Sequence, residues 1–141
     1  MEQIFSELNF ITNGEGFTDI TDDLNLFIQK SNFDSGIFSL TLLHTSCSLT
    51  INENADPNVL RDLEKYMKSI VPYNSYTSLS KEREDVYYKH SQEGEDDMPA
   101  HIKTALNNTN LSLSFQKGKI ILGTWQAIYL WEHRYSPKER S

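Results

Sequence analysis

The stretch LSLSFQKGKIILGTW, residues 111–125, decides the fold class. Apolar and polar residues alternate in LSLSF, which is the period of a strand with one buried face. A second run, KIILGTW, begins at Lys119. The residues between the two runs include Gly118, which suits a tight turn. We therefore predict a β-hairpin here, and the two strands of a hairpin are antiparallel.

Three helices and further strands are predicted on either side of this hairpin. Apolar residues at helical spacing follow Ile20. Asp56-Pro57 is typical of a helix start, because Asp caps the first turn and Pro fits the first helical position, and Pro99 predicts another start. The pattern predicts a single α+β domain over residues 1–141, with a mostly antiparallel, β-sandwich-like sheet and about three helices. Its other strands are expected near residues 2–10, 37–46, 86–88 and 126–134.

Composition narrows the class of protein. The chain has 141 residues, and 13 Lys and Arg against 20 Asp and Glu give a net charge of −7. Nucleic acids and membrane surfaces attract positively charged proteins, so neither is expected as a partner. Cys47 is the one cysteine, which excludes an internal disulfide and fits a reducing, cytoplasmic compartment. We see no secretory signal at the start and no apolar run long enough for a transmembrane helix.

Three histidines occupy positions where a predicted element meets a polar loop. His44 ends one strand, His90 ends another, and His101 lies in the first turn of the helix that begins at Pro99. The positive end of a helix favours the neutral imidazole, which is the form that binds metal. Three histidines with an open fourth position form a known type of catalytic zinc site. The spacing alone also allows them to be capping or surface residues.

Polar residues directly after an apolar strand are candidates for a pocket. A helix cap requires only Asp56, so capping does not explain the polar side chains of Asn52, Glu53 and Asn54. A solvated turn would explain them as well as a pocket would. Cys47 is itself a weak candidate nucleophile, since a residue three positions from His44 points to the opposite face of a strand.

Carboxylates and an amide elsewhere in the chain could join the same pocket. Asp97 closes an acidic run between two of the histidines, where it could fix a histidine tautomer or lie in a solvated loop. Gln126 and Glu132 are in phase with an apolar strand face, where a carboxylate must be paired, neutral or close to water. The alternative for Glu132 is a strand end, in solvent or paired with Arg134.

Three segments in order resemble the YjbQ family of small proteins, which are described as secondary thiamine-phosphate synthases. They are HTSCSLTINENADP (44–57), YKHSQEGEDDMPAHIK (88–103) and GTWQAIYLWEHR (123–134). The resemblance implies a compact α+β fold, a homotrimer and a site that holds a metal or an anion. The family's shared histidines fall on His44, His90 and His101, and its other shared polar positions fall on Ser46, Asn52, Glu53, Asn54, Asp97, Gln126 and Glu132.

The chain departs from the family at its end. Relatives continue after the EHR motif into a strand rich in β-branched residues, whereas this sequence ends in Ser136-Pro137-Lys138-Glu139-Arg140-Ser141. Proline and several charges argue against a strand there, so we expect an irregular end or a missing edge strand.

Three functions remain open. The first is the synthase reaction, which joins a pyrimidine pyrophosphate to a thiazole phosphate; we expect it to be slow, because the motifs offer only Lys103, Lys119 and Arg134 for the departing pyrophosphate. The second is a metal-dependent hydrolase or lyase of a small phosphorylated metabolite, with Glu53 or Asp97 as general base. The third is a non-catalytic, ligand-binding trimer. Histidine ligands favour Zn²⁺, with Mg²⁺ and Ca²⁺ as alternatives.

Overall fold

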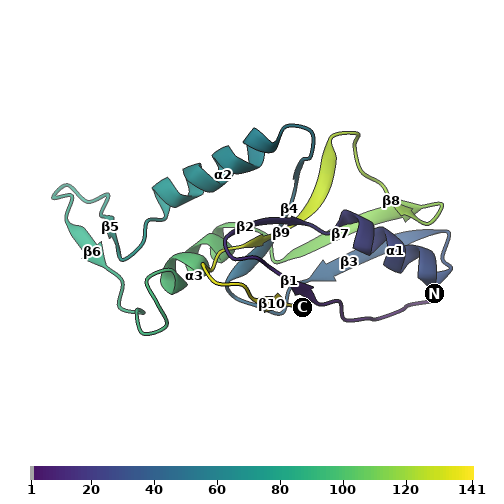
Figure 1. The fold of residues 1–141 in the computed structure, drawn as a ribbon, viewed down its shortest axis with the longest axis horizontal. Helices are drawn as coiled ribbons and strands as arrows, with labels where there is room; N and C mark the ends of the chain where they lie inside the picture. The colour runs from purple at the N-terminus through teal and green to yellow at the C-terminus, as the bar shows by residue number, and fades with distance from the viewer. Residues whose placement is uncertain (1) are drawn as a thin grey trace.

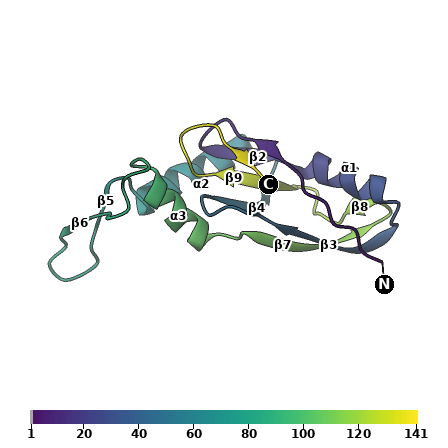
Figure 2. The same cartoon turned by 90° about the horizontal axis from the view of Figure 1, so that it is seen from below.

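The computed structural model of the protein describes residues 2–141. Two three-stranded antiparallel sheets pack against each other and confirm the predicted α+β, sandwich-like architecture (Figures 1 and 2). The first sheet has the order β2 (Gly16–Asp19), β9 (Gln126–Glu132), β4 (Cys47–Glu53). The second has the order β3 (Ser35–Thr41), β7 (Asn110–Gln116), β8 (Lys119–Ile120).

The hydrophobic core lies between these sheets and the first helix. Helix α1 (Thr21–Ser31) buries Leu24 and Ile28 in this core. Leu49 and Ile128 enter it from the first sheet, and Phe115 enters it from the second. The predicted hairpin is confirmed as β7–β8, where Lys117 and Gly118 both have positive φ, as a two-residue type I′ turn requires.

Two further helices lie on the side of the first sheet. Helix α2 (Pro57–Ile70) begins as predicted, because the Asp56 carboxylate accepts a hydrogen bond of 2.8 Å from the Asn58 amide. Helix α3 (Asp97–Leu106) begins two residues before the predicted start at Pro99. Between α2 and α3, β5 (Ser75–Thr77) and β6 (Asp85–Tyr87) form a hairpin that projects from the body (Figure 1).

Both chain ends differ from prediction. The predicted strand over residues 2–10 is wrong, since only β1 (Phe10–Ile11) is extended in a ladder. Its partner is β10 (Glu139–Arg140), a short strand where we expected none. The tail is extended because Arg140 reaches a buried carboxylate, an interaction that local propensity does not encode. No helix in the part of the chain that the structure describes is long and apolar enough to cross a membrane.

A buried ion pair fixes the C-terminal strand. The Arg140 guanidinium donates to both oxygens of Glu132, at 2.6 and 2.7 Å, and Glu132 is fully buried. The same carboxylate accepts from the Thr12 hydroxyl and from the amides of His133 and Arg134. Five donors therefore surround one carboxylate, which compensates for its removal from water.

We expect Arg140→Met to lower the free energy of unfolding by about 3–5 kcal/mol, because Glu132 would remain buried without its cation. Urea unfolding monitored by circular dichroism measures this change. Glu139→Gln, at an exposed position in the same strand, is the matched control and should change stability by under about 0.5 kcal/mol. Equal losses in the two variants would contradict the role of the pair.

Candidate metal centre

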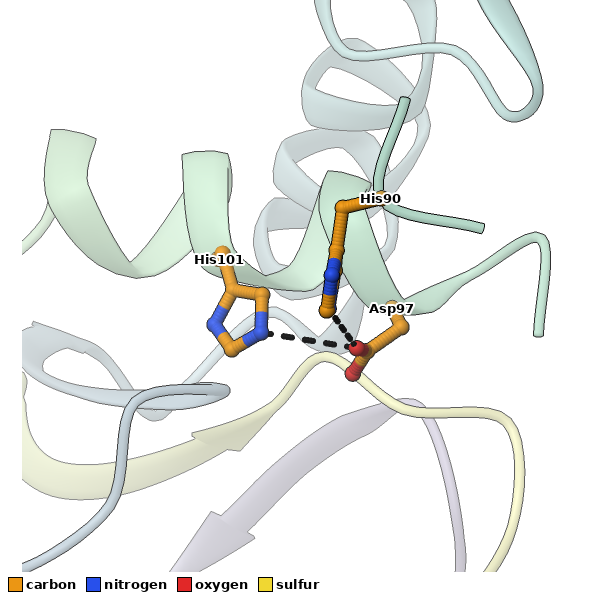
Figure 3. Close-up of side chains that lie close together, drawn as sticks. All are labelled: His90, Asp97 and His101. Atoms are coloured by element: carbon orange, nitrogen blue, oxygen red, sulfur yellow. Dashed lines mark hydrogen bonds and ion pairs between the residues drawn. The ribbon is translucent and has the colours of Figure 1, made fainter. Parts of the chain in front are cut away.

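Two histidines and an aspartate converge at one end of the sandwich. The Nε2 atom of His90 lies 2.6 Å from Oδ2 of Asp97, and Nε2 of His101 lies 3.5 Å from the same oxygen. One ligand atom from each residue lies within 4.8 Å of those of the other two. Figure 3 shows both imidazoles directed at the carboxylate.

Helix α3 and the loop before it position these groups. Asp97 and His101 are four residues apart on the helix, so their side chains share one face. His90 comes from the loop that joins the β5–β6 hairpin to α3 (Figure 3). Asp97 is buried, whereas the side chains of His90 and His101 are 46% and 32% exposed. The carboxylate therefore forms the buried side of this group, and the two imidazoles lie on its solvent-exposed side.

Arg134, just after the end of β9, binds the start of α3 through its side chain. Its guanidinium donates to the carboxylates of Asp96 (2.9 Å) and Asp97, and to the Glu93 carbonyl (2.8 Å). Burial raises the pKa of Asp96, but hydrogen bonds from the Tyr135 amide and from Arg134 outweigh it, so that this pKa is lowered overall. In Asp97, Oδ1 accepts from Arg134 while Oδ2 faces the two histidines.

The tautomer of His101 is set by a backbone carbonyl. Its Nδ1 lies 2.8 Å from the Thr45 oxygen, which can only accept, so Nδ1 carries a proton. In the tautomer with the proton on Nδ1, the lone pair of Nε2 would point to the centre, which is the usual arrangement of a metal-binding histidine. Thr45 was not a sequence candidate, because a contact to a backbone carbonyl leaves no local pattern. Asp96 belongs to the acidic run that we considered, but its long-range pairing with Arg134 could not be read from the sequence.

The donor set suits a borderline transition metal. Two imidazoles and one carboxylate match the protein ligands of catalytic zinc sites, which keep a fourth position for water or substrate. Mg²⁺ and Ca²⁺ prefer oxygen ligands throughout, so two nitrogen donors disfavour them. The residues present thus fit a divalent ion of the zinc type.

The structure does not place His44 in this group. Its Nε2 accepts a hydrogen bond of 3.0 Å from the Ser141 amide. His44 and His101 do line one shallow hollow of about 510 Å³. Asp97, which we considered as a general base, is instead the third member of the group whose ligand atoms converge.

Four of the other predicted polar residues, Asn52, Glu53, Asn54 and Gln126, lie at the opposite end of the same strand pair. In the β4–β9 ladder, Cys47 pairs with Glu132 near the metal end, and Glu53 pairs with Gln126 at the far end. Six residue steps separate these pairs, which is roughly 20 Å. The Asn52 oxygen accepts from the Glu53 amide, and the Gln126 oxygen accepts from the Gly123 amide. Asn54 is exposed beside them.

Three residues near the metal end belong to the buried interior. The Ser46 hydroxyl accepts from Arg140 at 3.0 Å, within the Glu132 network described above. Glu132 itself has no exposed surface. Burial raises the pKa of the Cys47 thiol to about 11, so this side chain is an unreactive core residue.

The chain also matches proteins of known sequence. The family model described as "UPF0047 protein YjbQ-like" matches residues 6–141. The chain belongs to the YjbQ (UPF0047) family. UPF0047 protein sll1880 of Synechocystis is 39% identical over 129 residues, covering 92% of this chain and 81% of that protein. UPF0047 protein YjbQ of Escherichia coli O157:H7 is 41% identical over 128 residues, covering 90% and 85%.

Solved structures of YjbQ-like proteins share the fold. An uncharacterised conserved protein of this family from Clostridium acetobutylicum superposes with a TM-score of 0.75 at 29% identity, over 96% of this chain and 97% of that one. The conserved hypothetical protein TT1486 from Thermus thermophilus gives 0.72 at 28% identity, with the same coverage. The first of these names states membership of the YjbQ/UPF0047 family, and neither name states an activity.

His133 is the middle residue of the EHR motif (132–134) and lies in the interior. It is 1% exposed, its Nε2 lies 2.9 Å from the Ser48 hydroxyl, and its Nδ1 has no hydrogen-bond partner among residues 2–141. Burial, together with the nearby positive charges of Lys103 and Arg140, lowers the pKa of His133 to about 3. This histidine is therefore neutral in the folded protein.

The low pKa of His133 predicts a loss of stability in acid. The unfolded chain takes up a proton near pH 6.5, whereas the folded chain resists protonation until about pH 3. The contribution of His133 to the free energy of unfolding is therefore constant above pH 7, and it falls as the pH drops below 6.5. Between pH 7.5 and 5, we expect the wild type to lose about 2 kcal/mol more than His133→Phe in urea unfolding. Parallel pH profiles would contradict this.

Proposed function

We propose that His90, Asp97 and His101 bind one divalent metal ion, with Zn²⁺ preferred. The observation that carries this proposal is the convergence of three ligand atoms within 4.8 Å at a solvent-open position. The Thr45 carbonyl and the Arg134 guanidinium support it, because they orient the two ligands on α3.

The same site supports a metal-assisted hydrolase or lyase of a small phosphorylated metabolite. When bound, such an ion lowers the pKa of a coordinated water and polarises a phosphoryl or carbonyl oxygen. His90 and His101 would hold the ion, and Asp97 would balance its charge. The exposed Lys89, which directly precedes His90, favours an anionic substrate. Glu53 would not serve this centre within one chain, since it lies at the far end of β4.

Thiamine-phosphate synthesis, which the family resemblance implies, receives less support from the residues. A departing pyrophosphate needs available cations. Lys103 is buried and donates to Glu15 at 2.7 Å, Arg134 is committed to two aspartates, and Lys119 lies in the second sheet. We therefore propose this reaction only as a slow activity. A rate near the median of about 10 s⁻¹, with the pyrimidine pyrophosphate and thiazole phosphate as substrates, would make it the main one.

We expect wild-type protein to bind about one equivalent of Zn²⁺ per chain, measured by elemental analysis and isothermal titration calorimetry. His101→Ala should weaken this binding on the order of 100-fold or more, because it removes a ligand rather than an outer contact. His44→Ala is the matched variant, since His44 lies beside the same hollow but outside the ligand group; its affinity should stay within about twofold.

The outcomes separate the remaining functions. Absence of zinc binding by the wild type would overturn the metal centre, and equal losses in both variants would assign His44 to it. Full turnover of a phosphorylated substrate by metal-free protein would retain an enzyme but overturn the metal-dependent reaction. Stoichiometric metal without turnover of any phosphorylated compound would favour the ligand-binding alternative.

We also propose a homotrimer, as the family resemblance implies. The β4–β9 pair carries polar groups at both ends, with the histidines at one end and Asn52–Asn54 at the other. A head-to-tail ring would bring the two ends of neighbouring copies together, which a single chain does not. Light scattering should then give three times the 16.3 kDa chain mass. A mass of one chain would contradict the ring.

A further inference from the structure

An apolar groove runs beside the edge strand of the second sheet. Its volume is about 1090 Å³, and its floor is formed by core residues that include Ile20, Ile28, Leu49 and Leu130. One wall is β3, and the other is the segment of residues 2–10, which was predicted as a strand. Ser141 lies at one end of the groove.

The wall formed by β3 offers unpaired backbone groups. In the three-stranded sheet, β3 pairs with β7 on one side and lies at the edge on the other. Just beyond the end of β3, the Leu42 amide donates to the Thr109 carbonyl, on the side of β7. The next amide, that of Leu43, donates to the Ser141 carbonyl on the opposite side. Because this direction alternates along a strand, Ile37, Ser39 and Thr41 direct their N–H and C=O groups toward the groove.

The opposite wall does not use these groups. No backbone hydrogen bond joins residues 2–9 to residues 35–41, although the two segments line the same groove. Phe5 remains 90% exposed and Ile37 remains 77% exposed. An edge strand with free amides above an apolar floor is the arrangement that accepts an added strand.

We propose that this groove binds an extended peptide strand of a partner protein, apolar at alternate positions and basic at its ends, added antiparallel to β3. Every ladder in the described chain is antiparallel, and the Leu43–Ser141 bond already shows the β3 side making a contact of this kind. Alternate apolar side chains would cover the floor, as the pleat of a strand requires. Among residues 2–141, Glu2 and Glu7 are the only charged side chains that line the groove, and they favour basic residues on the peptide.

A peptide fits this groove better than a fatty acyl chain does. Both could cover the apolar floor, but an acyl chain has no groups to pair with the edge amides of β3, and a carboxylate head would meet two glutamates. The proposal is independent of the metal centre, because none of the three candidate metal ligands lines the groove.

The test is binding of a dye-labelled peptide, Lys-Val-Thr-Val-Thr-Val-Thr-Val-Lys with blocked ends, to the full chain by fluorescence anisotropy. We expect saturable binding that weakens at least tenfold in Ser39→Pro, which deletes a groove-facing amide and leaves the β7 ladder intact. Ser39→Ala keeps the amide and should bind within twofold of the wild type.

A second arm uses wild-type protein only, so it does not depend on the folding of a variant. N-methylation of the same peptide at alternate residues removes its ladder donors and should weaken binding at least tenfold, while exchange of its lysines for glutamates should weaken it as well. Absence of binding, or binding that neither Ser39→Pro nor N-methylation changes, would overturn the proposal. Decanoate that binds equally to wild type and Ser39→Pro and displaces the peptide would assign the groove to acyl chains instead.

Discussion

The end of strand β9 is held by the buried pair of Glu132 and Arg140, and the surrounding structure depends on it. The Glu132 carboxylate contacts the segment before β2, the residues after β9 and the C-terminal strand together. Loss of a hydrogen-bond partner of a buried carboxylate is energetically costly, so the Glu132 carboxylate fixes the positions of these segments relative to one another. Two residues further on, Arg134 then meets the start of α3 at a defined place.

This arrangement divides the candidate centre into a fixed part and an adaptable part. Asp97 is buried and held by Arg134, and His101 is held by the Thr45 carbonyl. His90 comes from a loop at the base of the projecting β5–β6 hairpin and is the most exposed of the three. A loop histidine can adjust its position to an ion, while two helix-borne ligands fix where the ion binds.

Local features of the sequence predicted the fold well. The glycine turn of the β7–β8 hairpin and the Asp56 cap depend on residues within a few positions of each other, and both are confirmed. The pairing of Asp97 with His101 is also local, since four residues form one helical turn. His44 and the tail could not be placed in this way, because their partners lie 97 and 8 residues away and depend on how the sheets close. The resemblance to the YjbQ family supplied a residue set, but not its division between two ends of one strand pair.

The chemistry of the candidate ligands has a consequence for oxidative stress. All three candidate ligands offer nitrogen or oxygen donors, and the chain's one cysteine is buried with its thiol protonated. Thiolate metal sites lose their ion when peroxide oxidises sulfur, and exposed thiols form mixed disulfides. Neither reaction has a target at this centre, so oxidation of sulfur by peroxide would not displace an ion bound by the two histidines and Asp97.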